Sequence, residues 1–487
     1  MKVLLAGYNV DADIIETLKE KADWDRDNVT PETLSAAYAR ISRDPRDISV
    51  LRQVSSAEVD GARKSNERII FGFGHHSVAE HAIFNLDVIG LSRLAVEEVQ
   101  RFRLASYTEK SQRYITLEGD YYTPDEFRGE PIEAEYEQTV AFQNKTYISL
   151  YEELKKHLFL KHQKKVETPL GARTVDGWAK EDARYVLSLA TLSQFGMTVN
   201  ARNLERMLRR FRNSTLPEIR SLADSIYSIV GNFTPSIIQF TEPTPYDTER
   251  PEEMKNLLVL HSGLLNKECR SDDEDVELLY FTPDADDMLC ATILFQESCF
   301  SLSACLYSVK KMSREEKRDI IKTALSKREF YDNVDRFFES VDFTFQLNIS
   351  ASNYAQLKRH RMSTQVVQDY DTRTGYTIPE SISEIGKEDL FVEAIRTSEE
   401  LHEKLRVHFP DLKNYILTNA HRRRVMLKLN ARELYHLVSL RDDEHAQWDI
   451  RKTAARMSAL AREVAPLTTM MLCGKSDFDT FRERVFG

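Results

Sequence analysis

The chain of 487 residues has little glycine and proline and no long apolar run. Sixteen Gly and 14 Pro make up about half their usual combined share, whereas charged residues reach 30%, and this composition favours long helices over an all-β architecture. No stretch of eighteen apolar residues occurs, so we expect no membrane span. The start, MKVLLAGYNVDADIIE, has one Lys and an apolar run soon broken by acids. It predicts a buried first strand rather than a signal peptide.

Basic charge and paired cysteines are also missing. The formal net charge is −11, which argues against a nucleic-acid partner, because a protein that binds the phosphate backbone normally shows a basic domain or stripe. An anionic ligand would therefore need a local basic pocket. The cysteines form no CxxC pair and nothing is spaced like a zinc site, so we expect no bound metal and reduced thiols in a cytoplasmic protein. They are Cys269, Cys290, Cys299, Cys305 and Cys473.

The length exceeds what one hydrophobic core usually serves, and the sequence repeats itself. RFR at residues 101–103 is answered by RHR at 359–361, and NAR at 200–202 is answered by NAR at 430–432. In each case NAR follows a short extended run and opens a helical pattern. The midpoint, TEPTPYDTERPEEM, has little to bury and predicts a linker. We therefore predict two copies of one domain, residues 1–240 and 257–487, joined by a linker at residues 241–256.

A polar strip follows RFRL in the first copy. Within eight positions it offers hydroxyls, an amide, a carboxylate and a guanidinium, which are groups that bind a phosphate or the edge of a base. The alternative is a solvated loop with one Arg in a surface ion pair, and the spacing alone does not decide between the two. The strip consists of Ser106, Tyr107, Thr108, Glu109, Ser111, Gln112 and Arg113.

The whole segment RFRLASYTEKSQRY resembles the signature RHRxxSxNExSxRY of the flavin-dependent thymidylate synthase family, with Phe102 and Thr108 as departures. Three further segments of the first copy resemble that family: GHHSVAEH, which would meet the flavin, KEDARYVLSLAT, whose Arg184 would hold a phosphate, and GMTVNARNLERML. The resemblance implies an α+β fold. Each copy would be a mostly antiparallel sheet packed with long helices, and the two copies would form a pseudo-dimer.

The second copy complements the first. It has His360 where the first copy has Phe102, and its LNARELYHLVSLRDDEHAQWDI, which includes Arg441, matches the family closely, but the Ser, Glu, Ser and Arg of the signature are missing after RHR. The first copy has lost HAQW and keeps only Arg210 at the position of Arg441. In this family subunits share active sites, so the resemblance implies one composite site built from both copies. The alternative is that both copies have decayed.

The resemblance implies C5 methylation of dUMP to dTMP with bound FAD, using methylenetetrahydrofolate and NADPH as co-substrates. Arg441 would be the catalytic residue, because a fixed guanidinium stabilises the negative charge that develops on the uracil. Two other functions stay open: methylation or hydroxymethylation of another uracil nucleotide such as UMP, and flavin or nucleotide binding without turnover. One chain stands for two subunits, so a homodimer forming a pseudo-tetramer is expected.

The implied dUMP ligands are Arg441 itself and Glu109, Ser111, Gln112, Arg113, Arg184, Gln356 and Arg359. The implied FAD ligands are His75, Ser77, Glu80, Arg101, Arg103, Glu109, Asn200, Arg202, Arg359, His360, Arg361, Asn430, Arg432 and His436.

Overall fold

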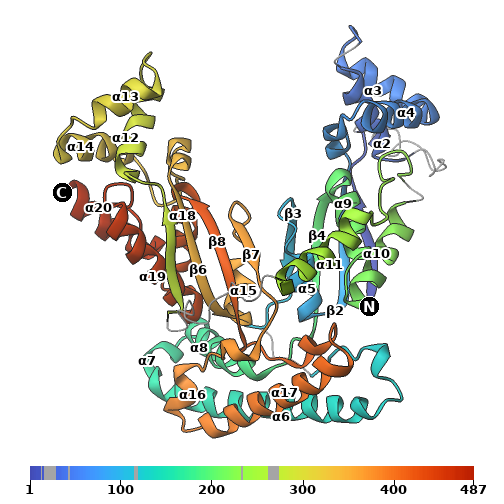
Figure 1. Cartoon of the computed structure of the whole chain (residues 1–487), viewed down its shortest axis with the longest axis vertical. Coiled ribbons are helices and arrows are strands. Elements are labelled where there is room, and N and C mark those ends of the chain that lie inside the picture. Colours follow the sequence, from blue (N-terminus) through green and yellow to red (C-terminus); the bar gives the residue numbers. More distant parts are fainter. Residues whose placement is uncertain (12–13, 16–28, 42–43, 114–118, 232–233, 261–273) are drawn as a thin grey trace. The chain divides into compact units, whose positions relative to one another are not determined.

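A computed structural model describes residues 1–11, 14–15, 29–41, 44–113, 119–231, 234–260 and 274–487 (Figure 1). The chain forms two compact units that do not follow the order of the sequence. Unit 1 comprises Met1–Asn144, Ser188–Cys269 and Glu400–Ile416, and unit 2 comprises Lys145–Leu187, Arg270–Glu399 and Leu417–Gly487. Each unit therefore contains a segment from the opposite half of the sequence. We call residues 145–187 and 400–416 the exchanged segments.

Unit 1 contains an antiparallel sheet with strand order β1-β2-β4-β3. Alternate residues of β2, among them Phe84, Leu86 and Val88, are buried, as expected for a strand with one face on a core. The predicted first strand is present, but it is not buried. It lies at the sheet edge, and Leu4 is 40% exposed. The strands are β1 Lys2–Tyr8, β2 Ile83–Ser92, β3 Ala105–Glu109 and β4 Leu192–Asn200.

The helices of unit 1 include α9 and α10, which pack on each other and on the sheet. Its elements are α2 Glu32–Arg40, α3 Ile48–Ala57, α4 Val59–Asn66, the π-helix η2 Glu67–Gly72, η3 His76–His81, α5 Arg93–Val99, η4 Asp125–Phe127, α9 Ala201–Arg212, α10 Pro217–Val230, α11 Pro245–Leu260 and η10 Lys413–Ile416. Helix α11 includes most of the predicted linker and buries no residue.

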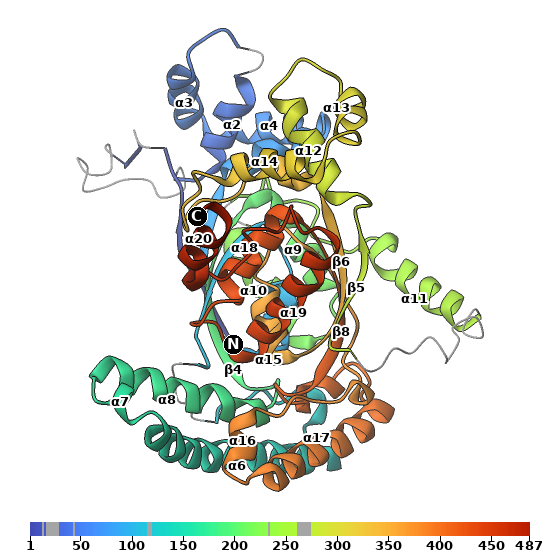
Figure 2. The ribbon, with the colours of Figure 1, turned by 90° about the vertical axis from the view of Figure 1, so that its left-hand side faces the viewer.

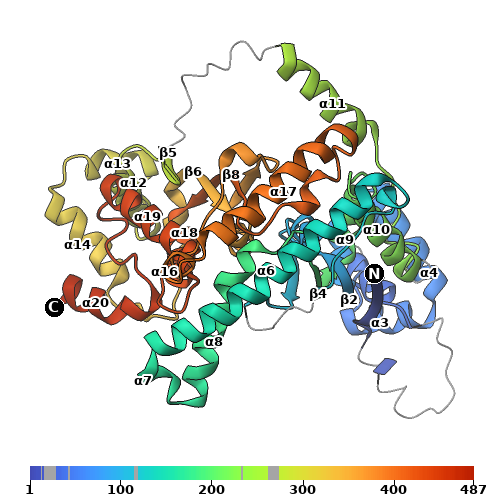
Figure 3. The ribbon, with the colours of Figure 1, turned by 90° about the horizontal axis from the view of Figure 1, so that it is seen from below.

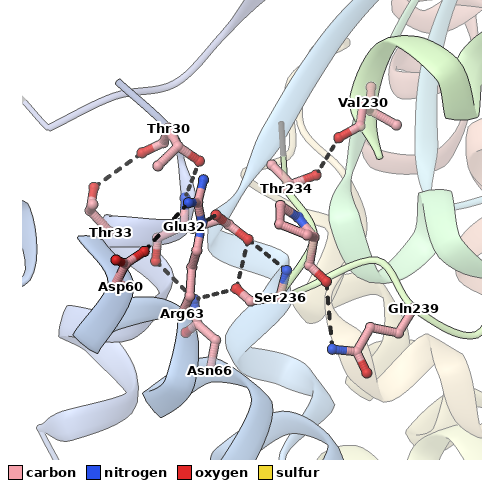
Figure 4. A network of polar contacts seen from close by, with 11 residues as sticks. Thr30, Glu32, Thr33, Asp60, Arg63, Asn66, Val230, Thr234, Ser236 and Gln239 are labelled. Atoms are coloured by element: carbon pink, nitrogen blue, oxygen red, sulfur yellow. Dashed lines mark hydrogen bonds and ion pairs between the residues drawn. The ribbon is translucent and has the colours of Figure 1, made fainter. Parts of the chain in front are cut away.

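A buried carboxylate ties α2 and α4 to the segment after α10 (Figure 4). Glu32 is fully buried. Its Oε1 accepts hydrogen bonds from the backbone N of Ser236 at 2.8 Å and from Ser236 Oγ at 2.6 Å, and its Oε2 accepts one from Arg63 Nε at 2.7 Å. Asn66 Nδ2 donates to the Glu32 carbonyl at 3.0 Å. A buried charge is tolerated only when it is paired in this way.

Unit 2 contains a second antiparallel sheet, with strand order β5-β6-β8-β7. Helices α15 Ala351–Leu357, α18 Ala431–Arg441 and α19 Trp448–Val464 cover one face of it, as Figure 2 shows. The core between them is apolar, with Phe343, Phe345 and Leu427 fully buried. The strands are β5 Val276–Phe281, β6 Asp342–Ser350, β7 Thr364–Val367 and β8 Arg422–Asn430.

The exchanged segment of unit 2 continues from α6 through α7 into α8, which folds back along α6 (Figure 3). Asp176 of α8 accepts a hydrogen bond from Tyr151 Oη at 2.7 Å and pairs with Lys155 Nζ at 2.8 Å. Helices α6 Pro131–Lys161 and α17 Glu388–His408 each contribute residues to both units. The other elements of unit 2 are α7 Gln163–Val166, α8 Pro169–Ala183, η5 Arg184–Val186, α12 Ala285–Gln296, α13 Leu302–Val309, α14 Arg314–Leu325, η8 Arg336–Ser340, η9 Thr372–Thr374, α16 Glu380–Glu384, η11 Lys475–Asp477 and α20 Phe478–Phe486.

The duplication is visible in register as well as in element order. Asn200 pairs with Ile83 at the end of β4, and Asn430 pairs with Asp342 at the end of β8. Each asparagine then caps the helix that follows, accepting a hydrogen bond from the backbone N of the residue three positions on, which is a preferred helix start. The α+β class and the tandem arrangement are confirmed. The predicted limits of the two copies stay a prediction.

Candidate functional site

A guanidinium and an imidazole contact each other in unit 2. Arg441 is the last residue of α18, and His360 lies just after α15. Arg441 Nε donates to His360 Nε2 at 3.0 Å, and Arg441 Nη2 donates to the Gln356 carbonyl at 3.4 Å. Burial, followed by the charges of Arg441 and His436, holds the pKa of His360 well below its usual range. His360 is therefore a neutral hydrogen-bond acceptor for Arg441.

The exchanged segment of unit 2 brings first-copy residues to this region. Gln356 Nε2 donates to Gln447 Oε1 at 3.3 Å, and Gln447 Nε2 donates to Tyr185 Oη at 3.0 Å. Arg184 is 8% exposed, and its Nη2 donates to Ser352 Oγ of α15 at 2.8 Å. Arg184, predicted from the first copy, therefore lies in the same unit as Gln356 and Arg441, and hydrogen bonds tie its segment to the residues of the second copy.

Tyr185 anchors that segment to a buried carboxylate. Its Oη donates to Asp449 Oδ2 at 2.8 Å, and Ser350 Oγ and Asn353 Nδ2 donate to the same carboxylate at 2.5 and 2.9 Å. Unit 1 repeats the arrangement. Tyr415 Oη, from its own exchanged segment, donates to Glu218 Oε1 at 2.8 Å, and Ser92 donates to Glu218 through its backbone N at 3.0 Å and through its Oγ. Each exchanged segment thus ends on an equivalent set of a tyrosine, a carboxylate and a serine, which we call the clamp.

Asp182 is a buried acid that sequence reasoning missed. It accepts hydrogen bonds from Trp448 Nε1 at 2.7 Å and from Ser381 Oγ at 2.6 Å. Desolvation by burial raises its pKa to about 7. It borders a cavity of about 530 Å³, lined also by Trp178, Lys165 and other side chains. The one sequence signal that could have identified Asp182 is its position two residues before the predicted phosphate ligand Arg184.

The remaining predicted residues of unit 2 either follow α15 or lie on the first turns of α18 and at its cap. Arg359 and Arg361 are exposed. Arg432 Nη1 pairs with Glu339 at 2.9 Å, and the His436 ring meets the His360 ring edge-on at 5.8 Å between centroids. Asn430 is engaged as the helix cap.

In unit 1 the polar strip is partly fixed. Glu109 Oε1 accepts from Arg93 Nη1 at 3.3 Å, and its Oε2 accepts from Gln100 Nε2 at 3.1 Å. Ser111 Oγ accepts from the backbone N of Arg113 at 3.2 Å, and Gln112 is 7% exposed. Tyr114, the last residue of the signature, lies outside the described residues. A guanidinium and an amide thus donate hydrogen bonds to the Glu109 carboxylate and hold it in place.

Glu80 and Arg202, two of the other predicted residues of unit 1, line a cavity of about 330 Å³. They form an ion pair, and the cavity is lined also by His76, Arg206, Arg209 and others. Three guanidinium groups and the two carboxylates of Glu80 and Glu205 meet at this cavity, and Arg209 Nε also pairs with Asp247 at 3.3 Å. His75, Ser77 and Arg103 are exposed, Arg101 pairs with Glu97 at 3.6 Å, and Asn200 caps α9.

One expected equivalence is wrong. Counted from the capping asparagines, the position of Arg441 is that of Phe211, because 441 − 430 and 211 − 200 are both 11. Phe211 meets Phe102 edge-on, with ring centroids 5.4 Å apart. An aromatic pair therefore stands in unit 1 where unit 2 has the pair His360 and Arg441. Arg210 lies one position away, with its guanidinium 5.8 Å from the centre of the Phe102 ring.

Two features are absent from the described ranges. None of their helices is long and apolar enough to span a bilayer. The same ranges hold no group of three or more His, Cys, Asp or Glu side chains arranged to bind a metal ion.

Comparison with known proteins gives consistent matches. The profile of the family described as thymidylate synthase complementing protein matches residues 26–236 and again residues 277–467. A UPF0159 protein of Chlamydia pneumoniae is 26% identical over 431 residues, covering 85% of this chain and 80% of that protein. A flavin-dependent thymidylate synthase of Geobacter sulfurreducens is 31% identical over 214 residues, covering 44% of this chain and 83% of that protein. A flavin-dependent thymidylate synthase of Helicobacter pylori, solved with FAD and dUMP, is 20% identical and covers 50% of this chain and all of that chain, with a TM-score of 0.30.

Proposed function

The chain belongs to the flavin-dependent thymidylate synthase family, and from this premise we propose that it methylates C5 of dUMP, using FAD, methylenetetrahydrofolate and NADPH. The observation that carries the proposal is the fixed guanidinium of Arg441, held by neutral His360 and by the Gln356 carbonyl. A positive charge fixed before the reaction stabilises the negative charge that develops on the uracil. The loss of one such donor typically costs about 3 kcal/mol, or roughly a hundredfold in rate.

Arginines also suit the nucleotide's phosphate, because their planar geometry allows paired hydrogen bonds to two oxygens. We propose that Arg184, Arg359 and Arg113 serve this role. Arg184 is the best prepared of the three, since its burial and its hydrogen bond to Ser352 limit its rotamers before any ligand arrives. Glu109, Ser111, Gln112 and Gln356 would contact the sugar and the base.

The three arginines at the 330 Å³ cavity in unit 1 suit the diphosphate part of a dinucleotide. Arg202, Arg206 and Arg209 extend from consecutive turns of α9, and His76 and Glu80 add polar groups. In unit 2, Arg432 and His436 are the matching residues of α18. We propose that these side chains hold FAD, which when bound supplies the redox chemistry of the methylation. The residues of the chain bind, orient and neutralise charge.

We also propose that one active site requires both sets of residues. Unit 2 contains Gln356, Arg359, His360 and Arg441 but no equivalent of the Ser, Glu, Ser and Arg strip, whereas unit 1 contains that strip but has Phe102 and Phe211 in place of the imidazole and the guanidinium. Arg113→Ala and Arg441→Ala should each reduce dTMP formation at least a hundredfold. Arg210→Ala, at the end of α9, is the matched control and should keep most of the activity. Activity that survives Arg441→Ala but not Arg210→Ala would refute this assignment.

The direct test is the absorption spectrum of the purified chain with and without NADPH, followed by product analysis on dUMP and UMP. A flavin spectrum that NADPH bleaches, with dTMP as product, supports the proposal. A methylated ribonucleotide would move the assignment to UMP. Flavin or nucleotide binding with no NADPH oxidation in the presence of either nucleotide would identify a binding protein and overturn the proposed reaction. The homodimer stays a prediction.

A further inference from the structure

A buried acid faces the histidine that holds Arg441. Glu433 is the third residue of α18 and is 7% exposed, and His360 is 2% exposed. Glu433 Oε1 lies 3.7 Å from His360 Nδ1. Neither atom has a hydrogen bond to a residue that the structure describes. Burying two polar atoms without such bonds costs free energy, so we expect a functional reason for their placement opposite each other.

The hydrogen bond on the other side of the ring shows where the His360 proton lies. An arginine side chain only donates, so Arg441 Nε can bond His360 Nε2 only while that nitrogen carries a lone pair. A neutral imidazole then carries its single proton on Nδ1. Nδ1 is the nitrogen that faces Glu433, and a carboxyl oxygen is its natural acceptor in either protonation state. Burial raises the pKa of Glu433, which leaves this argument unchanged.

The simpler reading is that Glu433 serves the start of the helix, where an acid interacts favourably with the helix dipole. Unit 1 argues against this as the full reason. Helix α9 has Asn203 at the matching position and begins with the same asparagine cap. In unit 1 the acid, the imidazole and the guanidinium are all absent, with Asn203, Phe102 and Phe211 at their positions. The helix forms without the acid, and the acid occurs where the imidazole and guanidinium occur.

We propose that Glu433 is a positioning residue: it keeps the proton of His360 on Nδ1, so that Nε2 remains the acceptor that fixes the guanidinium of Arg441. Without that acceptor the imidazole is free to rotate or to carry its proton on Nε2, and the Arg441 guanidinium loses its anchor. This inference rests on the proposed function only in that Arg441 acts on the nucleotide. Misplacing a catalytic group by about 1 Å costs on the order of a hundredfold in rate.

Two substitutions in the full-length protein separate positioning from folding. Glu433→Gln keeps an oxygen that can accept from Nδ1–H, whereas Glu433→Leu removes it and leaves an apolar side chain of similar size. We expect kcat on dUMP to fall 10- to 100-fold in Glu433→Leu, with KM for dUMP within a few fold, and Glu433→Gln to stay within a few fold of the wild type. The thermal midpoint of Glu433→Leu should not fall in parallel, because replacing a buried charge with an apolar group is often neutral.

The proton itself is observed by nitrogen NMR of histidine-labelled protein, with the His360 signals assigned from a His360→Gln sample. Wild type and Glu433→Gln should show an unprotonated Nε2, and Glu433→Leu should show a mixture of tautomers. This measurement needs no turnover, so an inactive wild type would refute the proposed reaction and leave the tautomer test intact. An unchanged His360 tautomer in Glu433→Leu, or a Glu433→Gln variant as impaired as Glu433→Leu, would overturn the positioning role.

Discussion

The buried carboxyl of Asp182 should make the stability of unit 2 depend on pH near neutrality. Its folded-state pKa is raised to about 7, chiefly by desolvation, whereas an unfolded Asp titrates near 3.9. Between these values the folded chain holds a proton that the unfolded chain has released. The free energy of unfolding should therefore be greatest below the unfolded pKa and fall as pH rises through about 7.

The magnitude follows from the two pKa values. A difference of about 3 pKa units corresponds to a stability contribution of at most about 4 kcal/mol, of which about 3 kcal/mol should be lost between pH 5 and pH 8. Asp182→Asn removes the titration while keeping an oxygen that accepts from Trp448 Nε1. Its free energy of unfolding should be nearly flat over this range, apart from the titration of other groups that it shares with the wild type.

The assay is urea unfolding at pH 5, 6, 7 and 8, followed by tryptophan fluorescence, to which Trp448 contributes next to the titrating group. Asp176→Asn is the matched control on the same helix. Its carboxylate is ion-paired with Lys155 and Lys180 and has a pKa lowered to about 2, so it stays ionised from pH 5 to pH 8. If Asp182→Asn keeps the pH slope of the wild type, or if Asp176→Asn removes it, the assignment to Asp182 is wrong.

Two further predictions concern folding. Glu32→Ala should lower the free energy of unfolding by about 3 kcal/mol or more, because it removes the buried acceptor of Arg63 and Ser236. The measurement is urea unfolding at pH 7. A decrease in the free energy of unfolding of less than about 1 kcal/mol would contradict the buried network. The two halves of the chain should be insoluble when expressed separately, as residues 1–240 and 257–487, and should co-purify when expressed together. The reason is that each half supplies an exchanged segment to the unit of the other. A soluble 1–240 fragment that unfolds cooperatively would contradict this prediction.

Local patterns predicted the elements that local forces determine. The extended runs before each NAR are strands β4 and β8, and both asparagines cap helices, because strand alternation and capping depend on neighbouring residues. The apolar first run predicted a strand correctly but its burial wrongly. Burial depends on the strand's place in the sheet, and β1 is an edge strand.

Features that depend on distant contacts were not predictable. The exchanged segments follow from the packing of Tyr185 and Tyr415 on Asp449 and Glu218, residues about 200 or more positions away in the chain. The equivalence of Arg441 with Phe211 was missed for a different reason. The run RRFR offers arginines on both sides of the phenylalanine, so only the helix register counted from Asn200 distinguishes them.

The two units differ in what each has kept. The tyrosine, carboxylate and serine clamp is present in both, as Tyr185, Asp449 and Ser350 in unit 2 and in equivalent form in unit 1. These groups hold exchanged segments in place and are needed wherever the fold is needed.

The pair of Arg441 and His360, by contrast, is replaced in unit 1 by two phenylalanines that pack on each other. A buried imidazole beside a half-buried guanidinium is costly to desolvate, whereas the two phenylalanines pack through apolar contacts. Unit 1 thus has the same fold without the imidazole and guanidinium at this position, and its Glu109 is held by Arg93 and Gln100. This difference between the units agrees with the proposal that the active site draws on different residues from each copy.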